Sequence, residues 1–303
     1  MDFVAIVTPN HLHFPIAMEA IAAGFHIMCE KPATMDLQEA LQLQVQLADR
    51  GLVYGLAHTY TGYPMVKEAR QRVADGELGR VRKVIVEYPQ GWLSDDSNDH
   101  AVWRLDAEQS GASCCMGDIG VHAANIAEYI CGQNIQSVCA DLNSVVASRD
   151  LDDDGTVLLR FDHGAKGVLI ASQICTGEEN PLKIRVYGEK AGLEWSQQEP
   201  NTLTIKQPDG SMQILRTGGG GLSITSHNST RLPGGHPEGY IEAFANLYRS
   251  FADQVRCCPN GQAADRTGSD LPGIEAAVRG MAFIETVVLA SASDTKWHQL
   301  KID

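Results

Sequence analysis

The first 56 residues alternate between short apolar segments and amphipathic segments, and this alternation constrains the fold more than any other feature of the chain. Residues 3–7, 26–29 and 52–56 are apolar runs, each typical of a strand that is buried on both faces. The two segments between them carry apolar residues at helical spacing and end at glycines, Gly24 and Gly51. Strand, helix, strand, helix, strand in this order predicts a parallel sheet with right-handed crossovers.

The middle of the chain has a different pattern. Residues 81–88 predict a strand, and residues 118–131 predict a helix. Residues 135–217 are mostly strand-like, with hairpin turns at Asp162-His163-Gly164 and Pro208-Asp209-Gly210. This segment therefore predicts a largely antiparallel sheet.

The chain closes with two predicted helices, at about 238–255 and 273–291, and a short strand near 297–302. The order of all these elements predicts an α/β fold with two domains. We place a parallel-sheet domain at residues 1–61 and an α+β domain at residues 62–303.

Composition excludes several classes of protein. The chain has 38 acidic and 24 basic residues and a net charge of −14, which disfavours nucleic-acid binding. It has no apolar run of ~18–20 residues, so we expect no membrane span. The start of the chain has no basic region and no signal-peptide cleavage site, and the eight cysteines form no C-x-x-C pair. We therefore expect a cytoplasmic protein with reduced thiols and no metal site.

Asp118 and His122 are the first candidates for catalysis. They lie four residues apart in a predicted helix, so they share one face of it. The pKa of an imidazole lies near neutral pH, which allows His122 to accept a proton from a substrate hydroxyl. Asp118 could orient that ring or bind a neighbouring hydroxyl. The alternative is a capping or solvated aspartate beside a structural histidine.

A second group of candidates follows the first two predicted strands. Glu30-Lys31-Pro32 comes directly after the second strand, and Thr8-Pro9-Asn10 and His13 follow the first. The carboxyl ends of parallel strands form the edge at which open α/β sheets bind ligands. Lys31 could bond a reacting hydroxyl and stabilise alkoxide charge, and the other residues could contact a dinucleotide. The alternative is a pair of surface loops, with Asn10 as a helix cap.

Two further segments are candidates for substrate binding. Trp103 and Arg104 lie in a polar loop before residue 118. An aromatic ring can pack on the C–H surface of a sugar, and a guanidinium can bond to its hydroxyl groups. His236 follows a long glycine-rich loop, residues 218–235, that could reach a cleft. The alternatives are a packing tryptophan with a solvated arginine, and an isolated loop histidine.

Taken in order, four segments resemble the Gfo/Idh/MocA family of oxidoreductases. Residues 4–13 (VAIVTPNHLH) look like the family's fourth Rossmann strand and the turn after it, and residues 29–32 (CEKP) look like its E-K-P motif. Residues 117–122 (GDIGVH) look like its catalytic helix, and residues 279–284 (RGMAFI) are similar to its last helix. The resemblance extends over essentially the whole chain.

The resemblance implies a function. A hydride would pass between a sugar or cyclic polyol carbon and NAD or NADP, with Lys31, Asp118 and His122 as the catalytic residues. The antiparallel sheet would form the interface of a homodimer or homotetramer. It also implies that residues 1–61 are a partial Rossmann domain.

One departure from the family pattern is large. The family begins with a strand and a G-x-G-x-x-G turn that holds the pyrophosphate, and no such turn precedes residue 1. We expect that roughly 60–90 residues are missing, through a misassigned start, a truncation or a natural loss. Cys114 and Cys115 are a smaller departure, because small residues are expected there.

Two other functions stay open on the sequence alone. A chain without the glycine turn could be a cofactor-free protein that binds sugars or supports an assembly. The resemblance also admits redox-assisted cleavage of a glycoside with a retained NAD.

Overall fold

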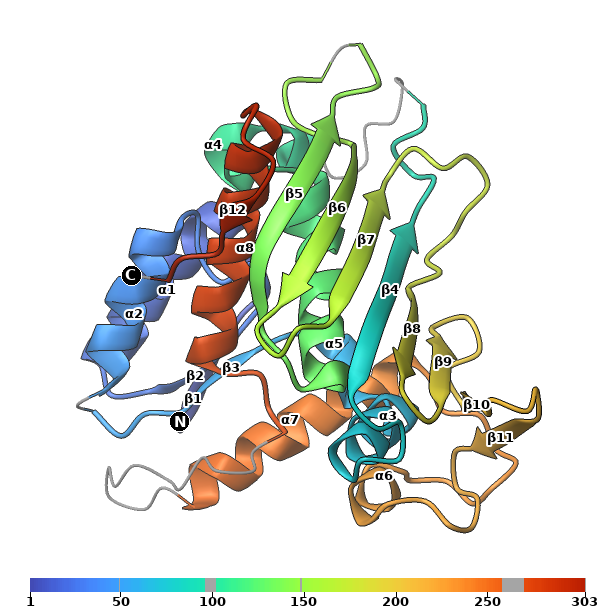
Figure 1. The fold of residues 1–303 in the computed structure, drawn as a ribbon. Coiled ribbons are helices and arrows are strands. Elements are labelled where there is room, and N and C mark those ends of the chain that lie inside the picture. The colour runs from blue at the N-terminus through green and yellow to red at the C-terminus, as the bar shows by residue number, and fades with distance from the viewer. Residues whose placement is uncertain (49, 96–101, 148, 258–269, 303) are drawn as a thin grey trace.

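The computed structural model describes residues 1–48, 50–95, 102–147, 149–257 and 270–302, and it contains two sheets (Figure 1). The first sheet is β1 (Phe3–Ile6), β2 (His26–Cys29) and β3 (Tyr54–Leu56). The second contains β4 (Val81–Pro89), β5 (Ile135–Asn143), β6 (Asp154–Phe161), β7 (Lys166–Ser172), β8 (Lys183–Gly188), β9 (Gly192–Ser196), β10 (Thr202–Lys206), β11 (Met212–Arg216) and β12 (His298–Gln299).

The α-helices are α1 (His13–Ala22), α2 (Leu37–Ala48), α3 (Pro64–Ala74), α4 (Ala107–Ser110), α5 (Val121–Cys131), α6 (Ile224–Asn228), α7 (Tyr240–Cys257) and α8 (Ile274–Ser291). Short 3-10 turns lie at Asn10–Leu12, Thr59–Gly62 and Val102–Leu105, and a π-helical turn lies at Met116–Gly120. No helix in the described part of the chain has both the length and the apolar character needed to cross a bilayer.

The first sheet is parallel, in the order β1-β2-β3, as the sequence predicts. Its core includes Ile6, Ile27 and Leu56 from the strands, and Ile21 and Leu43 from α1 and α2. β2 and β3 are almost entirely buried, as expected for continuous apolar runs in a parallel sheet, whereas Phe3 and Ala5 of the edge strand β1 are exposed. The sheet thus brings the carboxyl ends of β1 and β2 to one edge.

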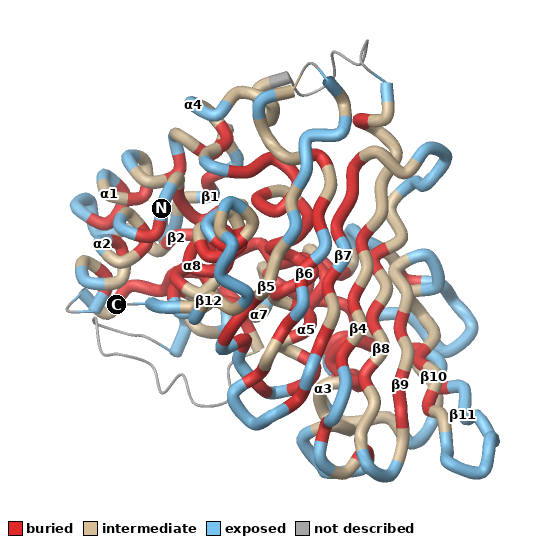
Figure 2. The backbone as a smooth tube through the Cα atoms, turned by 45° about the horizontal axis from the view of Figure 1, so that its top comes forward, coloured by how far each residue is buried: buried red, intermediate tan, exposed pale blue. Residues whose placement is uncertain are grey.

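The second sheet is mixed and runs in the order β11-β10-β9-β8-β4-β7-β6-β5-β12. Its pairs are antiparallel except β4 with β7, so the predicted antiparallel character is confirmed with one parallel pair. Residues alternate between buried and more exposed along the central strands, as Figure 2 shows for β4 to β7. The buried side packs on α5 and α3, and its core includes Phe161 and Trp195.

Helix α8 joins the two sheets. Ile274 and Ala277, near its start, pack in the core of the first sheet, whereas Phe283 and Val287 pack in the core of the second. Figure 1 shows α8 between the two layers. The C-terminal helices therefore contribute to both halves of the molecule, and the boundary after residue 61 stays a prediction.

Helix α3 is the main element that the sequence analysis missed. Pro64 occupies its first turn, a position that suits proline. Lys67 and Glu68 lie on its buried side, where Lys67 pairs with Asp270 and Glu68 with Arg72. Buried charges interrupt the apolar pattern from which amphipathic helices are recognised. Helix α6, capped by Ser223, likewise lies within the segment expected to be a loop.

Gly62 is expected to be intolerant of any side chain. A Cβ atom built there would lie 2.1 Å from the carbonyl oxygen of Ala243 in α7. We predict that Gly62→Ala lowers the free energy of unfolding by about 1–3 kcal/mol or more, because two packed backbones must separate. Gly220→Ala is the matched control, since its Cβ would meet no atom within 4 Å. Equal denaturation midpoints for the two variants would contradict this packing.

Candidate active site

A pocket of 150 Å³ lies at the carboxyl ends of β1 and β2. Most of the residues that the sequence analysis selected line it, namely Thr8, Asn10, Glu30, Lys31, Trp103, Arg104 and Asp118. They come from three parts of the chain that are far apart in sequence. The fold therefore gathers the predicted dinucleotide edge, the polar loop and the start of the predicted catalytic helix around one space.

Lys31 and Asp118 form an ion pair at this pocket. The Lys31 Nζ donates to Asp118 Oδ1 at 2.7 Å and to the Asp118 carbonyl oxygen at 2.5 Å. Arg104 Nε lies 3.4 Å from the same Oδ1, and Gln173 Nε2 donates to Oδ2 at 2.9 Å. Burial alone would raise the pKa of Asp118, but the charges of Lys31 and Arg104 outweigh it and hold the pKa below 3.8.

The charge of the pocket suits a reaction that develops negative charge. Two cations, Lys31 and Arg104, face one carboxylate, Asp118. Glu30 also lines the pocket, but burial raises its pKa, an effect that the charge of Lys31 only partly offsets. Fixed cations in a site with little water stabilise an alkoxide more strongly than water does.

The segment before α5 differs from the regular helix predicted over residues 118–131. Residues Met116–Gly120 form a π-helical turn, in which the hydrogen bonds span five residues. Asp152 organises its start, because its carboxylate accepts from Cys114 N and Met116 N at 3.0 Å and from Ser113 Oγ at 2.9 Å. Such turns occur often at functional sites.

The π-helical turn changes the expected relation between Asp118 and His122. The oxygens of Asp118 bind Lys31 and Gln173, with Arg104 beside them, and the ring of His122 instead meets His58, with Nδ1 to Nδ1 at 3.2 Å. The expectation that Asp118 orients the His122 ring is therefore wrong. An i, i+4 pair shares a face only in a regular α-helix.

His122 is 7% exposed and lies one turn further along the chain than Asp118, and it is not among the residues that line the pocket. Its ring packs edge-on against Tyr60 and His58, at centroid distances of 5.0 Å and 5.2 Å. Burial, and then the charge of Lys31, hold the pKa of His122 well below its usual value. His122 is therefore neutral near pH 7, and Lys31 is close enough for its charge to act on the ring.

The remaining predicted residues have varied environments. Asn10 donates to the Ser110 carbonyl at 3.0 Å, and Pro9 directly precedes the 3-10 turn that Asn10 begins. His13 is buried, with its ring nitrogens 2.8 Å from the Thr8 carbonyl and 2.7 Å from the Pro32 carbonyl. It holds the two loops together and does not line the pocket.

His236 lies outside this site. It is exposed, and its ring bonds to the Pro233 carbonyl of its own loop at 3.1 Å. His236 is not among the residues that line the pocket, so its role in substrate binding stays a prediction.

Several polar residues of the site were missed from the sequence. Tyr60 and Tyr88 share a short hydrogen bond between their hydroxyls, and Asn180 joins both of them. Gln173 bonds Asp118, and His58 bonds His122. They lie on separate elements with no common spacing, so only their places near strand ends could have indicated them.

Within the described ranges, no group of three or more His, Cys, Asp or Glu side chains is arranged to hold a metal ion. The described cysteines are free thiols. Burial raises the pKa of Cys29 and Cys114 to about 12, so both are uncharged near neutral pH.

Comparison with known families gives two matches. A family model described as an oxidoreductase family with an NAD-binding Rossmann fold matches residues 1–58. A second, described as the GFO/IDH/MocA C-terminal domain, matches residues 66–194.

Individual relatives agree with these matches. An inositol dehydrogenase homologue from Azotobacter vinelandii, solved with NAD+, is 33% identical with a TM-score of 0.94, and the alignment covers 99% of this chain and 78% of that one. The oxidoreductase YfiI of Bacillus subtilis, itself uncharacterised, is 29% identical, over 99% of this chain and 78% of the relative. Levoglucosan dehydrogenase from Pseudarthrobacter phenanthrenivorans is 28% identical, over 67% of this chain and 57% of the relative.

The bonds to Asp152 make a prediction about the π-helical turn. Asp152→Ala leaves two backbone N–H groups and the Ser113 hydroxyl without their acceptor. We expect the free energy of unfolding to fall by about 2–4 kcal/mol, measured by chemical denaturation. Asp209→Ala, at an exposed hairpin turn, serves as the control and should cost much less. A similar loss in both variants would show that Asp152 does not organise the turn.

Proposed function

Because the chain belongs to the GFO/IDH/MocA family of NAD-binding oxidoreductases, we propose that its pocket transfers a hydride between a hydroxyl-bearing carbon of a sugar or cyclic polyol and a nicotinamide cofactor. The observation that carries the proposal is the Lys31–Asp118 pair at the carboxyl edge of the first sheet. It places a donor-only cation where α/β sheets bind ligands.

The residues present fit a nicotinamide cofactor. Thr8 Oγ1 is buried at the pocket and has no hydrogen-bond partner among the described residues, so it can bond to a ligand there. Thr8 and Asn10, after β1, and Glu30 and Lys31, after β2, would hold it. When bound, NAD or NADP supplies the ring that accepts the hydride.

Lys31 and His122 have different roles at the substrate hydroxyl: Lys31 stabilises charge on the oxygen, and His122 accepts the proton. Two of the three N–H groups of Lys31 bind Asp118, which leaves the third to donate to the substrate oxygen and stabilise its charge. His122 is neutral and can accept the hydroxyl proton. Asp118 positions the ammonium, and Arg104 lies over the Trp103 ring at 4.5 Å, where the two can contact the sugar.

The relatives and the pocket lining both support the proposed substrate class. One structure of the Azotobacter vinelandii homologue, 32% identical with a TM-score of 0.92, holds NADH and myo-inositol. The lining of this chain's pocket includes Lys31, Arg104 and Asn10, which can bond to hydroxyl groups. A small polyhydroxylated ring fits this chemistry. The free thiols support a cytoplasmic setting.

The outer face of the second sheet supports assembly into a homodimer or homotetramer. Leu158 on β6 and Ile170 on β7 are 41% and 36% exposed on that face. Arg160 lies 3.7 Å from the centre of the Trp297 ring. Exposed apolar side chains on a sheet are typical of an interface.

Lys31→Met tests the proposed reaction. We expect the variant to lose about 100-fold or more in kcat/KM, because the developing alkoxide loses its cation. The assay follows NADH or NADPH formation with myo-inositol, levoglucosan and a wider panel of sugars. Lys190→Met, at an exposed turn, should leave the rate unchanged.

Calorimetry with NAD and NADP separates the proposal from its alternative. Binding of either cofactor supports an oxidoreductase. No binding and no turnover, together with sugar binding, would instead favour the cofactor-free role. Release of an aglycone without net NADH formation would indicate redox-assisted glycoside cleavage.

Replacing Leu158 and Ile170 together by Glu tests the proposed interface. Two charges on the outer face should shift the assembly to a lower mass by light scattering, because burying them is costly. Ile241→Glu places one charge at an exposed position of α7 and should leave the mass unchanged. A monomeric mass for the unsubstituted chain would overturn the proposal.

A further inference from the structure

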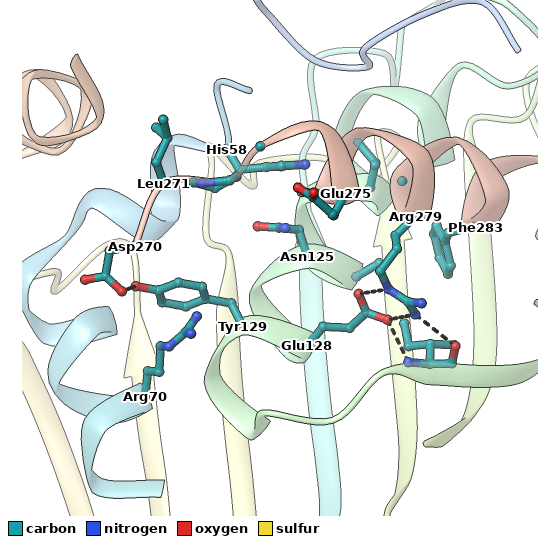
Figure 3. A pocket seen from close by; sticks show the side chains of 17 residues that line it. His58, Arg70, Asn125, Glu128, Tyr129, Asp270, Leu271, Glu275, Arg279 and Phe283 are labelled. Carbon is teal, nitrogen blue, oxygen red and sulfur yellow. Dashed lines mark hydrogen bonds and ion pairs between the residues drawn. The ribbon is translucent and has the colours of Figure 1, made fainter. Parts of the chain in front are cut away.

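A second pocket, of 270 Å³, lies between α5, α8 and the segment Asp270–Gly273 (Figure 3). Asn125 and Tyr129 of α5, and Glu275 and Arg279 of α8, line it, and Glu275 is exposed at the surface. The lining of the pocket thus combines polar side chains with apolar ones, among them Leu271 and Phe283, and the pocket reaches the surface at Glu275. None of these residues belongs to the Lys31 pocket.

His58 connects this second pocket to His122. It follows β3, is 1% exposed and lines the pocket, where Figure 3 shows its ring near Leu271 and Glu275. Its Nδ1 lies 3.2 Å from His122 Nδ1. Its Nε2 is buried and has no hydrogen-bond partner among the described residues. One ring nitrogen of His58 thus meets the ring of His122, and the other has no partner in the part of the chain that the structure describes.

Only one proton can lie between the two facing nitrogens. Burial, and then the charge of Lys31, lower the pKa of His58 to about 3 and that of His122 well below its usual value, so both rings are neutral near pH 7. A neutral imidazole carries its proton on one nitrogen and accepts with the other. A hydrogen bond between the two Nδ1 atoms therefore requires that one ring donates and the other accepts.

The two arrangements differ in whether His122 Nε2 can accept a proton from the substrate. If His122 Nδ1 donates, His122 Nε2 carries a lone pair and can accept the hydroxyl proton. If His58 Nδ1 donates, His122 Nε2 carries a proton and cannot act as a base. The proposed role of His122 as the base requires the first arrangement, because only a nitrogen with a free lone pair can accept the hydroxyl proton. This arrangement leaves the N–H of His58 on Nε2, and His58 lines the second pocket.

We propose that His58 is a positioning residue: its Nδ1 accepts the Nδ1 proton of His122 and keeps His122 Nε2 free to take the substrate's proton. This assignment rests on the proposed role of His122 as the base.

Two substitutions at one position test the assignment. Asn can present its amide oxygen where His58 Nδ1 lies, so His58→Asn keeps the acceptor and should retain most of the activity. His58→Ala removes the acceptor and should lower kcat by about 10–100-fold with little change in KM, because His122 then samples the wrong tautomer. Added imidazole should partly restore the rate of His58→Ala. Equal losses in both variants, or no loss in either, would overturn the assignment.

A second measurement does not depend on turnover. Nitrogen-15 NMR of histidine-labelled protein reports which ring nitrogen of His122 carries the proton. We expect Nδ1–H in the unsubstituted protein and in His58→Asn, and a shift toward Nε2–H in His58→Ala. Asn125→Ala alters the second pocket without removing the acceptor and should leave the tautomer unchanged.

The NMR result separates the two proposals. Nε2–H on His122 in the unsubstituted protein would refute the role of His58, whatever the activity. The expected tautomers in a protein that neither binds NAD or NADP nor turns over a substrate would leave the contact standing and refute the proposed reaction instead. A loss of folding stability in His58→Ala with no change of tautomer would show a merely structural role, and would also refute the positioning role.

Discussion

The ion pair between Lys31 and Asp118 is the interaction on which the rest of the site depends. The two side chains are only 12% and 18% exposed, so neither charge is well hydrated without the other. Breaking a buried pair leaves an uncompensated charge, and this cost fixes the geometry around it. Because Lys31 follows β2 and Asp118 precedes α5, the pair also joins the parallel sheet to the helix that carries His122.

Much of the fold was predictable because its strands and most of its helices obey simple periodicities. The parallel β1-β2-β3 sheet, the hairpins of the second sheet and the last two helices follow from apolar spacing and turn residues. Helix α3 was not predictable in this way, because Lys67 and Glu68 are buried charges, and Lys67 pairs with Asp270, far away in the sequence. Local sequence carries no signal for a charge whose partner lies 203 residues away.

In the site, too, some residues stand in local sequence patterns and others are defined only by tertiary contacts. Lys31 and Asp118 stand in recognisable local patterns, and the structure brings them together. Gln173, Tyr88 and His58 were not found, because each belongs to the site only through its tertiary neighbours. The orientation of Asp118 was also beyond local reasoning: the π-helical turn that directs it depends on Asp152, which comes later in the chain.

The packing of helix α8 affects when the protein can fold during its synthesis. Its residues complete both hydrophobic cores, and Glu285 accepts the Leu37 backbone N–H at the start of α2, at 2.7 Å. During synthesis from the N-terminus, the parallel sheet thus emerges from the ribosome long before the helix that covers it. Until residues 274–291 have been synthesised, the apolar side of the sheet that α8 covers stays open to chaperones and to misassembly, so both cores can be completed only after that point.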